Sequence, residues 1–371
     1  MKINPLFLIA PVLALVHPLP AGAEDSPVTL DMSGHFKIYG NYASQDGSSK
    51  TVDMLRDVDV TFSGETLLSN GLTVGALVNA DGDTQFDVED SFVYASGNWG
   101  RVSLGIEDGA AFLLQVAAPS ADDNVDGMET FVTPFNIAST RLSGTRFETE
   151  VSTFGLDYDN DLTAGIDKIS YYTPIFSGFQ AGVSYTPDVA NFSPASRGIN
   201  GNNPDDQLDE YGTAWETGLR YENQISDKLG YKAGAGYTSV EVENTNSVST
   251  IDTFTEWNIA LDLDIGAYGI GGVYTENNGG VKNNGESKTS VLGMDYTVGP
   301  VKYGASWLRN TREESAVEEI KANRLAAGII YEYGPGLSFR GTVSHLMVDA
   351  PSTLGGDVDG TAVTIGTQIF F

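Results

Sequence analysis

The chain of 371 residues contains no cysteine and few bases, with 20 Lys and Arg against 50 Asp and Glu. The absence of cysteine excludes disulfides, thiolate metal ligands and a cysteine nucleophile. The formal net charge of −30 argues against nucleic acid as a partner, because binding a phosphate backbone requires clustered Lys and Arg. The chain has only three histidines, His17, His35 and His345, which argues against a catalytic or metal site built from several histidines.

Long apolar runs are also scarce. Residues 1–23 have the parts of a secretory signal peptide: Lys2, an apolar stretch over 6–16, and a small-residue cleavage site at Ala21-Gly22-Ala23. We therefore expect an exported mature chain of residues 24–371. No later stretch approaches the roughly 18 apolar residues of a transmembrane helix. The absence of such a stretch does not exclude a transmembrane β-barrel, because its strands give only a weak alternating signal in the sequence.

Alternation with a period of two is what the mature chain does contain. In the stretch 28–43, Phe36, Ile38 and Tyr42 share one parity, whereas His35 and Lys37 share the other. This period predicts a β-strand with one apolar and one polar face. The pattern recurs along the chain to 361–371, and we count sixteen such runs. In the run over 85–94, the alternation predicts that Phe92 and Tyr94 lie on the apolar face.

The connections between these runs alternate in length. The short set is rich in Gly, Asn, Asp and Pro, which suit tight hairpin turns, and lies at 69–71, 97–100, 176–178, 226–228, 266–267, 299–300 and 334–336. The long set lies at 44–54, 108–167, 187–212, 243–251, 277–286, 311–320 and 349–360. Helical charge spacing over 311–324 predicts a loop helix there. Short turns on one rim and long loops on the other are typical of an outer-membrane barrel.

Several short motifs recur in the order and spacing of a known family. They are Ser33-Gly34-His35-Phe36, Phe62-Ser63-Gly64-Glu65-Thr66, Glu107-Asp108-Gly109-Ala110, Lys168-Ile169-Ser170-Tyr171-Tyr172-Thr173-Pro174 and a C-terminal Phe371. With them the mature chain resembles the Gram-negative general porins, above all those of alphaproteobacteria. The resemblance implies an all-β transmembrane antiparallel β-barrel of about sixteen strands. It also implies a homotrimer in the cell outer membrane, in contact with lipid and lipopolysaccharide, that passes small hydrophilic solutes and ions passively.

The longest connection, 108–167, is the best candidate for a functional site. It far exceeds an ordinary hairpin loop, and such loops usually have a function. The resemblance implies that it folds into the lumen and narrows it. The candidate acids of this constriction are Asp108, Asp122, Asp123, Asp126 and Glu129. Acidic rings in a pore favour cations. The alternative is a solvated outer loop whose acids only keep it soluble.

A constriction with an acidic loop is expected to face bases on the barrel wall. Bases with the inward parity are Lys37, Arg101, Lys168, Arg220, Lys232 and Arg340, and Lys302 and Arg324 share it. Lys37 lies farthest from its strand ends and is the best candidate. Porins of the family that the chain resembles commonly have a base at the position of Ile106, and some have Arg at the position of Asp59. A wall poorer in bases predicts a channel that prefers cations.

We expect no enzymatic activity, no resident metal and no cofactor. Acid pairs at Asp205-Asp206 and Asp122-Asp123 offer oxygen ligands for Ca²⁺, but EF-hand spacing is missing and solvation is the better interpretation. Three alternatives stay open. The first is a substrate-specific channel, the second a barrel enzyme such as a phospholipase, which needs a Ser/His pair, and the third a secreted all-β adhesin.

Overall fold

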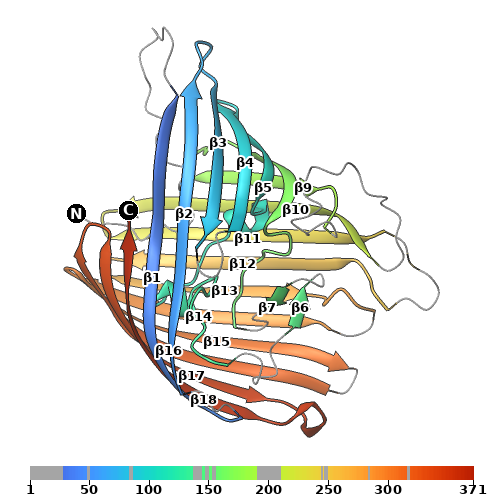
Figure 1. Ribbon diagram of the computed structural model, residues 1–371, viewed down its shortest axis with the longest axis vertical. Helices are drawn as coiled ribbons and strands as arrows, with labels where there is room; N and C mark the ends of the chain where they lie inside the picture. The colour runs from blue at the N-terminus through green and yellow to red at the C-terminus, as the bar shows by residue number, and fades with distance from the viewer. Residues whose placement is uncertain are drawn as a thin grey trace.

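Sixteen antiparallel strands close into a barrel, which confirms the predicted fold class and strand number (Figure 1). The computed structural model describes residues 28–47, 51–82, 87–136, 144–146, 150–152, 156–189, 210–243, 245, 250–282, 285–315 and 318–371. The predicted signal peptide and the Asp205-Asp206 pair lie outside these residues. Among the described residues, no helix is long and apolar enough to cross a membrane.

The barrel strands follow one another around the ring in chain order. They are β1 (Thr29–Gln45), β2 (Val52–Leu67), β3 (Thr73–Asp81), β4 (Asp87–Gly97), β5 (Gly100–Glu107), β8 (Ile166–Tyr172), β9 (Phe179–Thr186), β10 (Tyr211–Ser226), β11 (Leu229–Val242), β12 (Phe254–Ile265), β13 (Tyr268–Asn277), β14 (Ser287–Val298), β15 (Val301–Ser315), β16 (Glu318–Gly334), β17 (Leu337–Asp349) and β18 (Val358–Phe370). The remaining elements are α1 (Ala110–Leu113), α2 (Asp123–Asp126), a 3₁₀ turn η2 (Ser352–Leu354) and a separate two-stranded sheet of β6 (Gly144–Arg146) and β7 (Glu150–Ser152).

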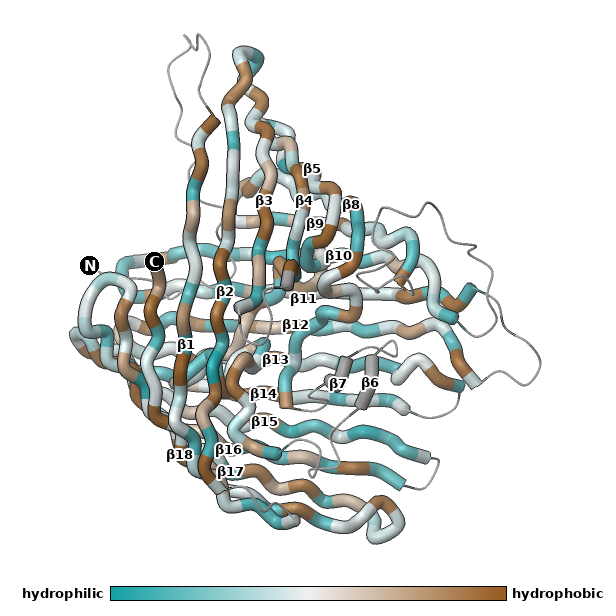
Figure 2. The backbone as a smooth tube through the Cα atoms, viewed as in Figure 1, coloured by the Kyte–Doolittle hydropathy of each residue, from teal (hydrophilic) through white to brown (hydrophobic). Residues whose placement is uncertain are grey.

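The two faces of each strand differ as a barrel in a membrane requires. On β12, Ile259 and Leu261 are exposed, whereas Asn258 and Ala260 between them are buried. The buried face is the inner one, because Asn258 Nδ2 donates to Gln115 Oε1, 2.8 Å away, in the segment that joins β5 to β8. Figure 2 shows the same alternation of polar and apolar residues along the strands. The outer face is therefore apolar and suited to lipid.

The ends of the chain close the ring. Strand β1 pairs with β18, and the register aligns Lys37 with Gln368. The amide of Gly34 donates to the Phe371 carbonyl at 3.0 Å, and the amide of Phe371 donates back at 3.1 Å. Every barrel strand thus has two neighbours, so the barrel leaves no open edge. A closed hydrogen-bonded ring of this kind is stable without the disulfides that a chain lacking cysteine cannot form.

Aromatic side chains gather at two levels of the outer surface. Near the long connections, the Tyr185 and Trp215 ring centroids are 4.6 Å apart, and Trp257 lies 5.3 Å from Tyr274. Near the short turns the pairs are Tyr221–Tyr231, Tyr268–Tyr296 and Trp99–Tyr171. Two aromatic belts flanking an apolar band are typical of a barrel that spans a membrane.

One predicted loop helix is wrong. Residues 311–315 and 318–324 extend strands β15 and β16, so the connection shrinks to residues 316 and 317. The charges follow the spacing of a strand, since Arg312 pairs with Glu314 and Lys321 pairs with Glu319, two residues away in each case. Residues two apart lie on the same face of a strand, so the charges that suggested a helix instead form pairs along one face of each strand.

The predicted face of β4 is also wrong at Phe92 and Tyr94. The β3–β4 register shifts at Glu89, since Asp90 pairs with Asn79 but Val88 pairs with Ala80. Because of this bulge, Val93 rather than Phe92 faces outward, and Val93 is exposed whereas Phe92 is buried. Phe92 and Tyr94 instead face inward, with the Arg101 guanidinium 5.2 Å and 4.6 Å from their ring centroids. A single extra residue reverses every face that follows it.

Candidate functional site

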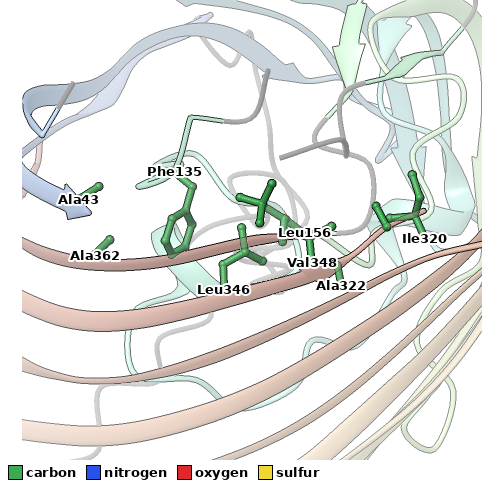
Figure 3. Close-up of a cluster of buried hydrophobic side chains, with 10 residues drawn as sticks. Ala43, Phe135, Leu156, Ile320, Ala322, Leu346, Val348 and Ala362 are labelled. Atoms are coloured by element: carbon green, nitrogen blue, oxygen red, sulfur yellow. The ribbon is translucent and has the colours of Figure 1, made fainter. Parts of the chain in front are cut away.

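The segment that joins β5 to β8 spans residues 108–165, and its residues 108–136 and 156–165 lie against the inner wall of the barrel. Its first helix, α1, packs on β8, β9, β10 and β11. Ala110 and Ala111 are fully buried, and the amide of Ala110 donates to the Ser184 hydroxyl at 2.9 Å. Farther along the segment, Phe135 and Leu156 pack against wall residues of β16, β17 and β18 such as Leu346 (Figure 3). The segment is thus attached to the wall at both ends of its course.

A track of glycines lets the segment approach the wall backbone. A Cβ on Gly218 would lie 2.1 Å from the Ala110 carbonyl oxygen, and one on Gly293 would lie 1.8 Å from the Pro119 carbonyl oxygen. The track runs across β9 to β16 and consists of Gly182, Gly218, Gly234, Gly236, Gly271, Gly293, Gly304 and Gly328. Any larger residue at its closest positions would push the segment off the wall. The sequence contains these glycines but does not reveal that they share one path.

The predicted constriction acids of α2 bind wall bases directly. Asp122 is fully buried, and its Oδ1 accepts from Arg340 Nη1 at 2.7 Å. Arg340 Nη1 also lies 2.8 Å from Asp123 Oδ1, and the Tyr39 hydroxyl donates to Asp122 Oδ2 at 3.1 Å. The structure therefore brings three predicted site residues together. Their contact attaches α2 to the wall of β1 and β17, and leaves Asp122 no access to the lumen.

Asp126 and Arg324 form a second attachment. Arg324 is almost fully buried and donates to the Leu156 carbonyl at 2.7 Å, and Asp126 Oδ2 accepts from the Ser306 hydroxyl at 2.7 Å. Burial raises the pKa of Asp126 to about 6, against the opposing field of Arg324. Arg324 has the inward parity in the sequence, but nothing local distinguishes it from a rim charge.

Lys37, the best candidate for a wall base, is fully buried and already paired. Its Nζ lies 2.5 Å from Asp57 Oδ2 on the neighbouring strand and 3.6 Å from the ring centroid of Phe131. The carboxylate compensates the ammonium, and the aromatic ring adds a cation–π contact. Lys37 thus contributes little uncompensated positive charge to the lumen.

The other predicted wall bases have partners as well. Arg101 Nη2 lies 3.0 Å from Glu107 Oε1, and Lys232 Nζ lies 2.8 Å from Asp262 Oδ2. Lys168 donates to backbone carbonyls, including that of Ile166 at 2.8 Å. The partners of Arg220 are Glu222 and, at 2.9 Å, the Gln115 carbonyl. These six bases hold local structure, and none stands as an isolated positive charge.

A second group of acids, the acidic cluster, consists of Asp108 and Glu129 of the segment together with Glu89 and Asp90 of β4. Asp108 and Glu89 both act electrostatically on Glu129, and Asp108 and Glu89 act on Asp90. Glu89 and Glu129 are exposed. None of the four carboxylates pairs with a base among the described residues. We predicted Asp108 and Glu129 from the sequence but missed Glu89 and Asp90, for which the β4 bulge removes a usable parity signal.

Enclosure within the barrel shifts the ionisation of Asp108. Burial is the largest cause and, together with the nearby Asp161 and Glu107 and against the opposing Lys168, raises the pKa of Asp108 to about 7. Asp108 therefore changes charge near neutral pH. The site therefore combines six predicted wall bases that have partners with an acidic cluster that has no ion pair among the described residues.

A family model described as Gram-negative porin matches residues 10–363. The chain belongs to the Gram-negative porins. Relatives of this porin include an uncharacterised protein of Rickettsia conorii, which is 23% identical over an alignment of 454 positions that covers 99% of each chain. A second, from Rickettsia prowazekii, is 25% identical over an alignment of 342 positions that covers 76% of each chain. The resemblance predicted from the motifs is confirmed.

Solved structures of similar fold are bacterial porins. An anion-selective porin from Comamonas acidovorans covers 93% of this porin and 100% of its own chain, with a TM-score of 0.65 and 16% identity. The trimer form of OmpT from Vibrio cholerae covers 93% and 100%, with a TM-score of 0.59 and 13% identity. Identities this low establish a shared fold, and the selectivity of each channel has to be argued from its own residues.

Proposed function

We propose that this porin forms a water-filled channel in the cell outer membrane for passive diffusion of small hydrophilic solutes and ions, with a preference for cations. The observation that carries the preference is the contrast between paired bases and unpaired acids. The six wall bases contact carboxylates or carbonyls, whereas the acidic cluster of Glu89, Asp90, Asp108 and Glu129 has no ion pair among the described residues.

The electrostatic argument concerns the charges that a passing ion meets. A buried pair such as Arg340 with Asp122 nearly cancels at a distance, so it has little influence on permeating ions. Exposed Glu89 and Glu129 have no base within the described part of the chain to compensate them when they are ionised, and the low-dielectric wall keeps their fields in the lumen. Enclosure within the barrel and the neighbouring Asp108 raise the pKa of Glu129 well above its ordinary value, so its field is strongest at alkaline pH. The anion-selective relative from Comamonas acidovorans has the same fold, which is consistent with selectivity depending on such charges.

The alternative of a barrel enzyme is less well supported. A phospholipase would need a histidine positioned on a serine nucleophile. His35 Nε2 lies 3.0 Å from Asp57 Oδ1, and His345 Nδ1 shares a hydrogen bond of 2.9 Å with the Thr361 hydroxyl. Neither partner is the serine nucleophile that such an enzyme would need. The apolar outer face and its aromatic belts favour a membrane protein over a secreted adhesin.

A homotrimer exported by an N-terminal signal peptide and surrounded by lipid and lipopolysaccharide is part of the proposal. Support comes from the trimer form of the similar OmpT and from the apolar outer surface of the barrel. The trimer can be checked on gels, where an unheated sample should migrate at three times the chain mass and a boiled sample as a monomer. A monomer in both lanes would contradict the trimer.

The test of selectivity is the reversal potential in a planar bilayer with a KCl gradient. The wild-type channel should show a cation-selective potential. At alkaline pH, where Glu129 is ionised despite its raised pKa, Glu129→Gln should reduce it, because the variant removes one exposed charge of the acidic cluster. The matched control is Glu313→Gln, which removes an exposed charge near the end of β15. Anion selectivity of the wild type, or an equal effect of the two variants, would refute the proposal.

A further inference from the structure

Three potential metal ligands meet on the inner face of β1 and β2, and none of them is among the constriction acids that the sequence suggested. His35 pairs in register with Asp59, and the neighbouring pair is Lys37 with Asp57. One ligand atom from each of His35, Asp57 and Asp59 lies within 4.8 Å of the others. His35 Nε2 is 3.0 Å from Asp57 Oδ1 and 3.8 Å from Asp59 Oδ2. One imidazole nitrogen thus faces two carboxylate oxygens.

The imidazole nitrogen lies close to two carboxylates without a well-aligned hydrogen bond to either. The His35 side chain is nine-tenths buried, and its Nε2 atom is 3.0 Å from Asp57 Oδ1, but the contact lacks hydrogen-bond geometry. A nitrogen lone pair that faces two carboxylate oxygens is unfavourable without positive charge between them, so a cation that uses this lone pair would stabilise the arrangement. A cation shared by the three residues satisfies the nitrogen and both oxygens at once.

The distances suit a small divalent cation. Zinc binds imidazole nitrogen and carboxylate oxygen at about 2.0–2.2 Å, so two of its ligands lie roughly 3.0–3.5 Å apart at tetrahedral or octahedral angles. The separations of His35 Nε2 from Asp57 and Asp59 bracket that range. A nitrogen ligand beside carboxylates favours first-row transition metals over Ca²⁺ or Mg²⁺, which prefer oxygen alone.

Neighbouring side chains fix the three ligands. The imidazole of His35 lies edge-on between the rings of Phe131 and Phe370, with centroids 6.4 Å and 6.2 Å away. Lys37 binds only the other oxygen of Asp57, Oδ2, and so orients that carboxylate while leaving Oδ1 toward His35. Such supporting contacts are what orients the ligands of metal sites. The Asp59 side chain is 19% exposed, which gives an ion a path from the lumen.

From this geometry we propose that His35, Asp57 and Asp59 bind a first-row divalent cation such as Zn²⁺ in the lumen wall. The site shares no residue with the acidic cluster, which contains no nitrogen ligand. Bound metal would add positive charge to the wall beside Lys37 and link β1 to β2. The proposal does not depend on the selectivity of the channel, since binding to the closed barrel can be measured without current.

The test is calorimetric titration of ZnCl₂ into the tag-free, detergent-solubilised protein. One Zn²⁺ per chain should bind, and an excess of Ca²⁺ or Mg²⁺ should not displace it. His35→Ala and Asp59→Asn should each weaken binding by roughly tenfold or more. The matched control is His345→Ala, which removes the other histidine of the proposed mature chain and should leave binding unchanged. Heat-dependent migration on gels checks that each variant forms the closed barrel.

A spectroscopic measurement on the wild-type chain keeps the proposal testable if a variant fails to fold. Cu²⁺ added at one equivalent should give an electron paramagnetic resonance spectrum with coupling to a single nitrogen. Absence of stoichiometric Zn²⁺ binding, retention of binding in His35→Ala, or copper coordinated by no nitrogen or by several would each overturn the proposal.

Discussion

Arg340→Gln should release the segment inside the barrel from the wall at α2. In the wild type, Arg340 Nη1 lies 2.7 Å from Asp122 and 2.8 Å from Asp123. Glutamine keeps a polar side chain but no charge and is too short to reproduce both contacts. Asp122 is fully buried, so its carboxylate would lose its base without gaining water.

The magnitude follows from this burial. Breaking a buried ion pair by removing one partner costs about 3–5 kcal/mol, because the remaining charge is uncompensated. The Asp123 side chain is one-third exposed, so water screens it and its contact adds little. At about 1.4 kcal/mol per tenfold change, the undocked population of α2 should rise by roughly a hundredfold or more.

A single introduced cysteine can measure this population, because the chain has no cysteine of its own. Val125 lies in α2, is fully buried and packs with Tyr39 and Val132. Valine to cysteine is a small change in volume, so Val125→Cys should leave α2 in place. The rate of maleimide modification of this thiol should increase in the Arg340→Gln background by the same factor as the undocked population, provided that opening and closing are fast.

Two further variants test whether Arg340 is the attachment of α2 to the wall. Lys232→Gln removes an inward base paired with Asp262, on strands that α2 does not contact, and should leave the labelling rate unchanged. Asp122→Asn combined with Arg340→Gln should restore part of the protection, since no buried charge then lacks a partner. A labelling rate in Arg340→Gln equal to that of the Val125→Cys parent would refute the assignment of Arg340 as the attachment of α2.

Two other predictions concern the wall and the pH dependence. Gly293→Ala places a Cβ 1.8 Å from the Pro119 carbonyl oxygen and should destabilise the docked segment by about 1–3 kcal/mol, detected as open-channel noise in single-channel recordings. Gly341→Ala, whose Cβ would meet nothing closer than 3.9 Å, is the matched control and should be silent. The carboxyl group of Asp108, whose pKa enclosure in the barrel raises to about 7, is charged above that pH and neutral below it, so cation selectivity should fall as the pH decreases from 8 to 6. Asp108→Asn should reduce this change in the reversal potential without abolishing it, because the pKa of Glu129 is raised as well. An unaltered pH profile in that variant would contradict the assignment.

The amino-acid sequence determined the barrel. Alternation with a period of two is a local property, since each residue's face follows from its neighbour's, and the sixteen runs correspond to the sixteen strands of the ring. The inward parity of His35, Lys37 and Arg340 could be predicted in the same way, as could the long segment after β5. The number of strands and the lengths of the connections follow from the order of residues along the chain, so the sequence alone could predict them.

Only the tertiary structure decided which charges meet. Asp122 and Arg340 are 218 positions apart, and no local pattern predicts that their contact neutralises both. The bulge at Glu89 depends on pairing between β3 and β4, and it reverses the faces of Phe92 and Tyr94. An ion in the lumen meets the charged residues that this long-range pairing leaves without a partner. Which residues these are depends on the closure of the ring and on the docking of the segment against the wall. For that physical reason the sequence alone predicts a porin, whereas the lining of its lumen requires the folded structure.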